Sequence, residues 1–530
     1  MPSDSTSIET TYIERGFHSQ ETLNHWIESN ANRIGDRAAI ISAQGTISHR
    51  ELYENVHKMA RGLSGLGVRK GDIVAIQLPN CPEFVIGVLA ICSIGAIVQM
   101  LHMPYQRKEI QYLLSDSNAV AVICLTSFKD YSPAGVILDL VESGLGALHV
   151  IALGKDIAGA RNYAGLSDAG QRAVSDVPDA RSPFVLLYTS GTTAKPKGVL
   201  HRYDSFLGNA ATAAKELNIT PDDRVLSLAA MTHLYGLFTL NMTLSVGGAV
   251  VLLPAFSPSA FKEVLNQLEP TAVFAAPAHF IASTKDSVVD SNDLACVNLV
   301  CLSGAHVPAE LADRIDGLLG AGKVIQLWGM TELQAGTYGR PSTAKASRFE
   351  TAGPPSPGTE LRVIDADGEE LGPNSEGELH VRGPSVFKEY MNKPDETEAA
   401  FSADGWFITG DLAQIDENGC LSITGRVKEI INRGGVKYNP IEIEEPLQRM
   451  AQIDACAIVP IKDDVMGEIA CLFAVVSEGQ HLTLGDVTDH LQSDGIAKYK
   501  WPERLETISV MPLTPTGKVM RGELKARLTS

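Results

Sequence analysis

The sequence predicts an α/β protein whose larger part is built on parallel, doubly wound sheets. Short apolar stretches such as "DIVAIQL" (72–78), "AVAVICL" (119–125) and "AVVLLP" (249–254) have the continuous apolar character of strands that are buried on both faces. Segments long enough for a helix separate these stretches along the chain. Strands and helices that alternate in this way form parallel sheets, with sites at the C-terminal ends of the strands.

The elements of this region can be assigned in chain order from their patterns. Helices are expected at 21–34 and 48–67, where apolar residues recur at helical spacing. Further strands are expected at "AAIIS" (38–42), "LHVIAL" (148–153), "FVLLY" (184–188), "AVFAAP" (272–277), "LVCLSGA" (299–305) and "KVIQLWGM" (323–330).

The pattern changes near residue 351. The stretches "TELRVIDADG" (359–368), "GELHVRG" (377–383) and "CLSITG" (420–425) are punctuated by Gly, Asp and Pro, which predicts antiparallel hairpins or a small barrel over about 351–425. The last hundred residues combine strands at "ACAIVPI" (455–461) and "ACLFAVV" (470–476) with a helix near 484–495. We therefore expect a domain over 1–427, in which the doubly wound part ends near 350, and a smaller α+β domain over 428–530.

Length and composition limit the function classes. A chain of 530 residues is too long for one core, and 44% hydrophobic with 20% charged residues is ordinary for a globular protein. The formal net charge of −19 argues against nucleic acid as a partner, because its phosphates require a basic face. The eight cysteines include no C-x-x-C pair, which favours reduced thiols over disulfides or a zinc site.

Two long apolar stretches, 84–101 and 225–256, are the candidates for a membrane span. Each is interrupted by glycine and each is better explained by a buried helix that runs into a buried strand. The polar, acidic N-terminus does not resemble a signal peptide, and the final "RLTS" is not the peroxisomal S-K-L address. We expect no membrane span and a cytoplasmic location.

The stretch "LLYTSGTTAKPKGVLH" (186–201) has the composition of a phosphate-binding loop. Glycines and hydroxyls follow a buried strand, where backbone N–H groups can point at phosphate oxygens. The G-x-x-x-x-G-K-[ST] pattern of a Walker loop is absent, because Pro196 occupies the place of its second glycine. Read by itself, the stretch fits an ordinary surface turn as well as a phosphate site.

Six motifs that we place at turns or near the C-terminus occur in a fixed order. They are "YTSGTTAKPKG" (188–198), "LSGA" (302–305), "QLWGMTE" (326–332), "WFITGD" (406–411), "GRVKEIINRGG" (425–435) and "PLTPTGKVMR" (512–521). Together they resemble the adenylate-forming superfamily of acyl-CoA synthetases, aryl-acid ligases, luciferases and peptide-synthetase adenylation domains. The resemblance spans nearly the whole chain and implies two doubly wound subdomains plus a β-barrel, with a small mobile C-terminal domain.

The resemblance also implies a reaction. A carboxylate attacks the α-phosphorus of ATP to give an acyl-adenylate and pyrophosphate, and a thiol then attacks the acyl carbon. Because two anions must be brought together, the site requires cations and N–H dipoles. The residues implied to bind the nucleotide are Thr189, Ser190, Gly191, Thr192, Thr193, Lys197, Ser303, Gly304, Ala305, Trp328, Gly329, Met330, Asp411 and Arg426.

Several of these positions carry specific roles by resemblance. Thr331 and Glu332 match the contacts to the α-phosphate and Mg²⁺, since a carboxylate beside a triphosphate requires a hard cation between them. Asp411 would accept from both ribose hydroxyls. Without the other motifs, a solvated loop acid is the favoured interpretation of Glu332, and a turn aspartate explains Asp411 equally well. The chain departs from the family at Ala194, where glycine or serine is usual and a Cβ restricts φ.

The C-terminal motifs imply a mobile part of the site. Lys518 matches the lysine that reaches the carboxylate and the α-phosphate during adenylation, and Lys428 occupies the hinge position. Gly434 and Gly435 would line the approach of the thiol. The basic residues Lys498 and Lys500 offer a local cluster for the phosphates of coenzyme A, although a solvated helix end explains them equally well.

The stretch "MTHLYGLF" (231–238) predicts the class of acid. Amino-acid adenylation domains carry an aspartate here, and this chain has none, which disfavours an α-amino acid. His233, Tyr235, Gly236 and Trp328 suggest a mostly apolar pocket for an aromatic, alicyclic or medium-chain fatty acid. His233 matches a gating residue of the family, and a satisfied core histidine is the alternative.

The sequence therefore predicts an AMP-forming acid–thiol ligase that uses ATP, Mg²⁺ and coenzyme A. The runner-up is an aryl-acid ligase that loads the phosphopantetheine of a separate carrier protein. A non-catalytic nucleotide-binding relative is disfavoured because Lys518, Glu332 and Asp411 are all present. Luciferase-like oxidation uses the same adenylate, but it is the less expected activity. The particular acid and the state of the chain as monomer or homodimer stay open.

Overall fold

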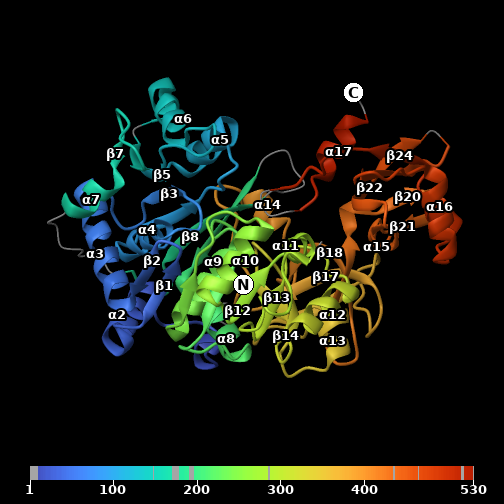
Figure 1. The fold of residues 1–530 in the computed structure, drawn as a ribbon, viewed down its shortest axis with the longest axis horizontal. Helices are drawn as coiled ribbons and strands as arrows, with labels where there is room; N and C mark the ends of the chain where they lie inside the picture. The colour runs from blue at the N-terminus through green and yellow to red at the C-terminus, as the bar shows by residue number, and fades with distance from the viewer. Residues whose placement is uncertain are drawn as a thin grey trace. The chain divides into compact units, whose positions relative to one another are not determined.

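The structure is a computed structural model that describes residues 10–146, 148–169, 178–189, 196–284, 287–433, 436–463, 465–514 and 518–528. The chain divides into two compact units (Figure 1). The first unit comprises Met1–Phe349, Pro355–Glu360 and Arg382–Phe401, and the second comprises Glu350–Pro354, Leu361–Val381 and Ser402–Ser530. The predicted domain boundary near residue 427 stays a prediction.

The first unit contains an eight-stranded sheet with the order β15-β14-β13-β12-β10-β11-β1-β2. Its strands are β1 (Ala38–Ser42), β2 (Gly45–Ser48), β10 (Arg224–Ser227), β11 (Ala249–Val251), β12 (Ala272–Ala275), β13 (Leu299–Leu302), β14 (Lys323–Met330) and β15 (Gln334–Tyr338). The central pairs are parallel, whereas β2 and β15 pair antiparallel at the two edges. The expected parallel strands are confirmed, and the two antiparallel edges make the sheet mixed.

A second, seven-stranded sheet in this unit has the order β7-β6-β5-β3-β4-β8-β9. Its strands are β3 (Ile73–Gln77), β4 (Ile97–Met100), β5 (Ala121–Leu125), β6 (His149–Leu153), β7 (Arg161–Asn162), β8 (Pro183–Thr189) and β9 (Lys197–Arg202). Only β8 and β9 pair antiparallel, as a hairpin at the edge of the sheet. The candidate phosphate loop connects these two strands.

Helices precede, connect and follow the strands of these two sheets. They are α2 (Leu23–Ile34), α3 (His49–Gly65), α4 (Pro82–Ser93), α5 (Arg107–Ser117), α6 (Pro133–Leu140), α7 (Tyr163–Ala169), α8 (Tyr203–Glu216), α9 (Leu234–Val246), α10 (Pro258–Leu268), α11 (Pro277–Thr284), α12 (Ala309–Leu318), α13 (Lys345–Glu350) and α14 (Pro394–Glu398). Helix α3 begins with a capping box, in which the Ser48 hydroxyl accepts from the Glu51 N–H and the Glu51 carboxylate accepts from the Ser48 N–H.

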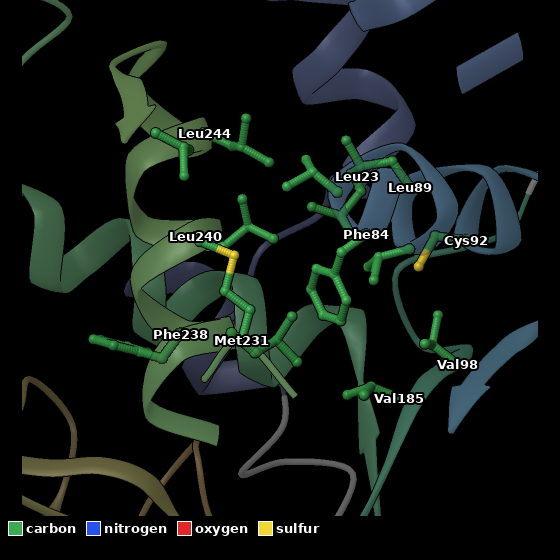
Figure 2. Close-up of a cluster of buried hydrophobic side chains, with 14 of the residues drawn as sticks. Leu23, Phe84, Leu89, Cys92, Val98, Val185, Met231, Phe238, Leu240 and Leu244 are labelled. Atoms are coloured by element: carbon green, nitrogen blue, oxygen red, sulfur yellow. The ribbon is translucent and has the colours of Figure 1, made fainter. Parts of the chain in front are cut away.

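The two apolar stretches that raised the question of a membrane span form the core of the first unit. Residues 84–101 form most of α4 and all of β4, and residues 225–256 contain most of β10 and all of α9 and β11. Figure 2 shows Phe84 and Leu89 of α4 facing Leu240 of α9 across this core. Within the described residues, none of the helices combines the length and apolar character that a membrane crossing requires.

Alternate residues along the strands point into different cores, which explains the continuous apolar runs. In β10, Val225 joins the core shared with α4 and α9, while Leu226 joins a second core with α10 and α12. In β5, Ile123 joins the shared core and Val122 joins a third core with α5 and α6. Both sheets are therefore covered on both faces, as a doubly wound fold requires.

The second unit contains two further sheets. Strands β16 (Glu360–Ile364), β17 (Gly377–Arg382), β18 (Phe407–Ile415) and β19 (Leu421–Arg426) form a four-stranded sheet in that order. The five-stranded sheet has β21 (Val436–Tyr438), β20 (Ile431–Arg433), β23 (Gly467–Val476) and β22 (Ile453–Asp463) in order, and β24 (Arg504–Thr507) pairs with β23. Helices α15 (Ile441–Gln448) and α16 (Leu484–Ser493) contribute to one core with this sheet, and α17 (Arg521–Arg527) contributes to another.

The hairpins predicted over 351–425 are present. The pairs β17–β18 and β18–β19 are antiparallel. The strand order of this sheet runs from β16 to β19 without a pairing between those two strands in the described part of the chain. Of the two architectures that the punctuated sequence allows, an open antiparallel sheet describes these strands better than a closed barrel.

Candidate active site

The candidate phosphate loop lies between β8 and β9 in the sequence of the first unit. Its described ends, Thr189 and Lys197, face each other in the register of the hairpin. The Thr189 hydroxyl is buried and has no hydrogen-bond partner within the described residues. Four residues expected in the loop, namely Ser190, Gly191, Thr192 and Thr193, lie outside the described residues, as does Ala194.

Several contacts hold the base of this hairpin. The Tyr188 hydroxyl donates to Asp116 Oδ2 at 2.7 Å, and the Tyr112 hydroxyl donates to the Pro196 carbonyl at 3.2 Å. Burial, followed by the hydrogen bond to Asp116, raises the pKa of Tyr188, so its hydroxyl keeps the proton that it donates. The strands on either side of the loop are therefore fixed by side chains from α5.

Thr331 and Glu332 lie in the turn between β14 and β15, and residues from two other segments of the first unit hold this turn. His201 of β9 donates from Nε2 to the Thr331 carbonyl at 2.7 Å, and the Phe387 N–H donates to the Glu332 carbonyl at 2.7 Å. The Tyr390 hydroxyl donates to Glu332 Oε1 at 3.0 Å. Burial lowers the pKa of His201 to about 4, so the imidazole is neutral and carries its proton on Nε2.

Glycine at position 329 is required by the geometry of this hairpin. A Cβ on Gly329 would lie 2.0 Å from the carbonyl oxygen of Gln334, which is a backbone atom that cannot move aside as a side chain can. Gln334 itself has a positive φ of 64°, which closes the turn tightly. The turn that carries Glu332 thus depends on a glycine three residues before it.

We expect Gly329→Ala to destabilise the chain by about 2–3 kcal/mol, because the new Cβ forces β14 and β15 apart. The same shift displaces the turn, so adenylation should fall together with stability. Gly317→Ala is the matched control, since a Cβ there meets no atom within 4 Å and the residue lies in α12. Calorimetry gives the melting temperatures of both variants, and equal values would contradict the clash at Gly329.

The predicted acyl-pocket residues lie at the start of α9. His233 caps this helix, accepting from the Tyr235 N–H at 3.3 Å, and burial lowers its pKa to about 4. The Tyr235 hydroxyl donates to the Cys301 carbonyl at 2.8 Å, so it links α9 to β13. A Cβ on Gly236 would lie 2.4 Å from the Ala230 carbonyl oxygen, and this close approach explains the glycine.

A second histidine, which our sequence analysis missed, lies beside His233. The ring centroids of His102 and His233 are 6.0 Å apart, and His102 Nδ1 is 2.9 Å from the Thr232 hydroxyl. Burial, and then the electrostatic cost of protonating both neighbouring rings, lower the pKa of His102 to about 3. The signal was its position directly after β4, because the C-terminal ends of parallel strands gather site residues.

The residues expected around adenine follow β13 and end β14. Ser303 is buried and its N–H donates to the Ala275 carbonyl at 3.0 Å. Gly304 has a φ of +90°, which favours glycine, and Ala305 is exposed. Trp328 and Met330 belong to β14, where Trp328 is buried and Met330 is partly exposed.

The second unit holds the residues expected to bind ribose. Asp411 of β18 and Arg426 of β19 are register partners, and Arg426 Nε lies 2.7 Å from Asp411 Oδ1. The Asp411 side chain is only 3% exposed, so its carboxylate is buried and paired. A buried carboxylate held by an arginine is a fixed acceptor, which suits a pair of sugar hydroxyls.

Lys518 belongs to the same electrostatic environment as this pair. The side chain is exposed, yet desolvation by the surrounding protein and then the charge of Arg426 lower the pKa of its ammonium. Glu429 and Asp411 oppose this shift. The fold therefore gathers the lysine of the C-terminal motif with the ribose-binding motifs of the second unit.

A partly buried arginine, three residues after Lys518, is a second residue that the sequence did not single out. Arg521 donates to both oxygens of Glu444, at 2.6 and 2.9 Å, and to the Ile458 carbonyl at 2.7 Å. Its Nε lies 3.0 Å from Glu429 Oε2. The signal was the basic residue that ends the motif "PLTPTGKVMR".

The remaining predicted residues of the second unit are less informative. Lys428 is exposed in the turn Val427–Glu429. Its role as a hinge stays a prediction. Gly434 and Gly435 lie outside the described residues. Lys500 pairs with Glu442, whereas Lys498 is exposed. The predicted basic cluster for coenzyme A is thus partly neutralised by an acidic neighbour.

Each unit thus presents buried carboxylates, cations and hydrogen-bond donors of the kind that handle a nucleotide, and the first unit has a doubly wound α/β fold. The protein class that these features define is a nucleotide-binding enzyme. The chain belongs to the AMP-binding enzyme family: residues 27–391 match the AMP-binding enzyme family, and residues 442–518 match its C-terminal domain. It is an acid–thiol ligase of the AMP-forming acyl-CoA synthetase family.

Individual relatives agree with this assignment over nearly the whole chain. A feruloyl-CoA synthase of Amycolatopsis sp is 31% identical and covers 95% of this chain and 99% of its own length. A salicyl-AMP ligase / salicyl-S-ArCP synthetase of Mycobacterium tuberculosis is 31% identical, and the match covers 96% of this chain and 91% of the relative. The ATP-bound structure of MatB from Rhodopseudomonas palustris superposes with a TM-score of 0.86 at 26% identity, and the match covers 96% of this chain and 99% of MatB. The resemblance found in the motifs is confirmed, and ATP binding is supported.

Proposed function

We propose that this protein joins an apolar aromatic, alicyclic or medium-chain fatty acid to coenzyme A through an acyl-adenylate. The observation that carries the proposal is the Thr331–Glu332 turn, which is fixed through the Thr331 carbonyl and both the carbonyl and the carboxylate of Glu332. A preorganised turn of this kind, beside the lysine of a phosphate loop, is suited to charge that develops on a phosphate during reaction.

In the first half-reaction, an oxygen of the carboxylate forms a bond to the α-phosphorus of ATP while the bond to pyrophosphate breaks. We assign the β- and γ-phosphates to the loop that ends at Lys197, and the α-phosphate to Thr331. Asp411 and Arg426 would hold the ribose, and the Lys518 ammonium would offset the charge of the two reacting anions. Each of these groups is a donor, an acceptor or a cation of the type that its partner requires.

In the second half-reaction, the sulfur of the thiol bonds to the acyl carbon and AMP leaves with the electrons of the C–O bond. The thiol proton is released to solvent. We propose Gly434 and Gly435 for the approach of the thiol and Lys428 for the hinge, following the motif positions. Lys498 is the better candidate for a coenzyme A phosphate than Lys500, because Lys500 already pairs with Glu442.

The class of acid follows from the start of α9. An α-ammonium group buried there would require a carboxylate partner, and residues 231–238 contain none. His233 is neutral at physiological pH, since burial lowers its pKa to about 4. The Tyr235 hydroxyl is already bonded to the Cys301 carbonyl. These features support an acid whose body is apolar.

Magnesium fits this site as a companion of the nucleotide. Among the described residues, no group of three His, Cys, Asp or Glu side chains is arranged to hold a metal ion. Mg²⁺ commonly binds through one or two carboxylates together with substrate phosphates, so the single carboxylate of Glu332 meets that requirement. When bound, the ion would neutralise phosphate charge.

The test is pyrophosphate release from ATP and Mg²⁺ over a panel of carboxylic acids, each with and without coenzyme A. We expect continuous release that requires coenzyme A for one chemical class of acid, and we expect Glu332→Gln to abolish most of it. A single stoichiometric burst that coenzyme A leaves unchanged would instead indicate transfer to a carrier protein. No release with any acid would contradict the proposal.

A further inference from the structure

Tyr390 contacts both of the charged groups that we assign to the phosphates and the metal. Its hydroxyl donates to Glu332 Oε1 at 3.0 Å. The Lys197 ammonium lies over its ring, 4.1 Å from the ring centroid. The residue is 5% exposed and lies in the segment Arg382–Phe401 of the first unit. One buried side chain therefore joins the lysine of β9 to the carboxylate of the β14–β15 turn.

We propose that Tyr390 is a positioning residue that holds Lys197 and Glu332 at separate places, so that the ammonium can bind phosphate and the carboxylate can bind Mg²⁺. The inference rests on the function proposed above. A lysine and a glutamate this close to one aromatic ring would otherwise attract each other, and a direct pair would neutralise both charges. The ammonium contacts the face of the ring and the carboxylate contacts the hydroxyl, so the two charged groups meet different parts of the same side chain.

The tyrosine can fill this role because it offers two different surfaces. The π face attracts a cation, whereas the hydroxyl donates to a carboxylate. Burial and the charge of Glu332 raise the pKa of Tyr390, so the hydroxyl stays protonated and remains a donor. Phenylalanine would keep the first interaction and lose the second, and leucine would lose both.

The backbone around Tyr390 is held firmly enough to fix the position of its ring. The Tyr390 N–H donates to the Thr397 hydroxyl at 3.0 Å, and the residue forms a β-bridge with Val199 of β9. The next residue, Met391, donates from its N–H to the Gly198 carbonyl at 2.8 Å. The segment is thus attached to the strand that begins with Lys197, so the ring and the ammonium keep their relative positions.

The experiment measures how ATP and Mg²⁺ bind, and not only how fast the enzyme turns over. Wild type, Tyr390→Phe and Tyr390→Leu are titrated with α,β-methylene-ATP by calorimetry, first in EDTA and then over a range of Mg²⁺ concentrations. Tyr163→Phe is the matched control, because it also removes a buried tyrosine hydroxyl, one that donates to the Glu83 carbonyl at 3.1 Å.

We expect Tyr390→Phe to bind the analogue normally in EDTA but to require about 10-fold more Mg²⁺ for the same gain in affinity, as is typical when the partner of a metal ligand is removed. Tyr390→Leu should in addition bind at least about 5-fold more weakly in EDTA, because the cation–π contact is lost and Lys197 can pair with Glu332. In a Glu332→Gln background, Tyr390→Phe should change the Mg²⁺ requirement by less than about 2-fold.

A Mg²⁺ requirement for Tyr390→Phe that equals that of Tyr163→Phe would overturn the inference. The same holds for an effect of Tyr390→Phe that persists in full in the Glu332→Gln background, because the hydroxyl would then act elsewhere. If wild type itself fails to bind the analogue, the proposed function fails and this inference with it. Tyr390→Phe keeps the ring in place, so the test stands even if the leucine variant does not fold.

Discussion

Replacing Lys518 with alanine is expected to slow acyl-adenylate formation by about 10²–10³-fold, the usual loss when one preorganised group that offsets transition-state charge is removed. Thioester formation from supplied acyl-AMP should be affected much less. The reason is that the carboxylate and the α-phosphate, whose charges the ammonium offsets, meet only in the first half-reaction. Desolvation and then the charge of Arg426 lower the pKa of Lys518, so the protein by itself stabilises this ammonium poorly and a substrate anion beside it would restore the lost stabilisation.

The two half-reactions can be measured separately. Exchange of labelled pyrophosphate into ATP reports adenylation, and release of AMP from acyl-AMP with coenzyme A reports transfer. Lys525→Ala is the matched control, because Lys525 is an exposed lysine of α17 seven residues further along the chain. Equal losses in both half-reactions for Lys518→Ala would count against the role assigned to this lysine.

The fold was predictable where burial and local pattern agree. Strands such as β3 and β5 are apolar throughout because both of their faces are covered, and that covering is visible in the residues themselves. The short edge strands were not predicted, because "GTIS" in β2 and "RN" in β7 contain almost no apolar residues. Their pairing depends on a neighbouring strand already being in place.

The site was predictable only for residues that carry their chemistry within a motif. Glu332 and Asp411 stand in motifs that resemble a family, so their positions were found. His201 and Tyr390 act through contacts with residues 130 and 58 positions away, and no local pattern encodes such distances. Arg521 stands in a quoted motif, but its role became visible only when the fold brought Glu429 and Glu444 to it.

Arg521 leads to the second large effect, which is on stability. Arg521→Ala is expected to lower the free energy of unfolding of the second unit by about 3 kcal/mol or more. The Glu444 side chain is 8% exposed and the Arg521 side chain 18%, so truncation leaves a buried carboxylate without its bidentate partner. The loss should appear in hydrogen exchange as faster opening of β22 and α15, which this arginine of α17 contacts through Ile458 and Glu444.

Two comparisons isolate the buried charge as the cause. Arg527→Ala removes an arginine of the same helix whose partner, Glu523, is exposed, and it should cost less than about 0.5 kcal/mol. Arg521→Met combined with Glu444→Leu removes both charges and should recover much of the stability lost in Arg521→Ala, because the most deeply buried carboxylate is gone and the other partner of Arg521, Glu429, is 27% exposed. If the double variant is as unstable as Arg521→Ala, the loss comes from packing around the arginine stem. If Arg521→Ala loses no more than Arg527→Ala, the pair contributes nothing to the fold.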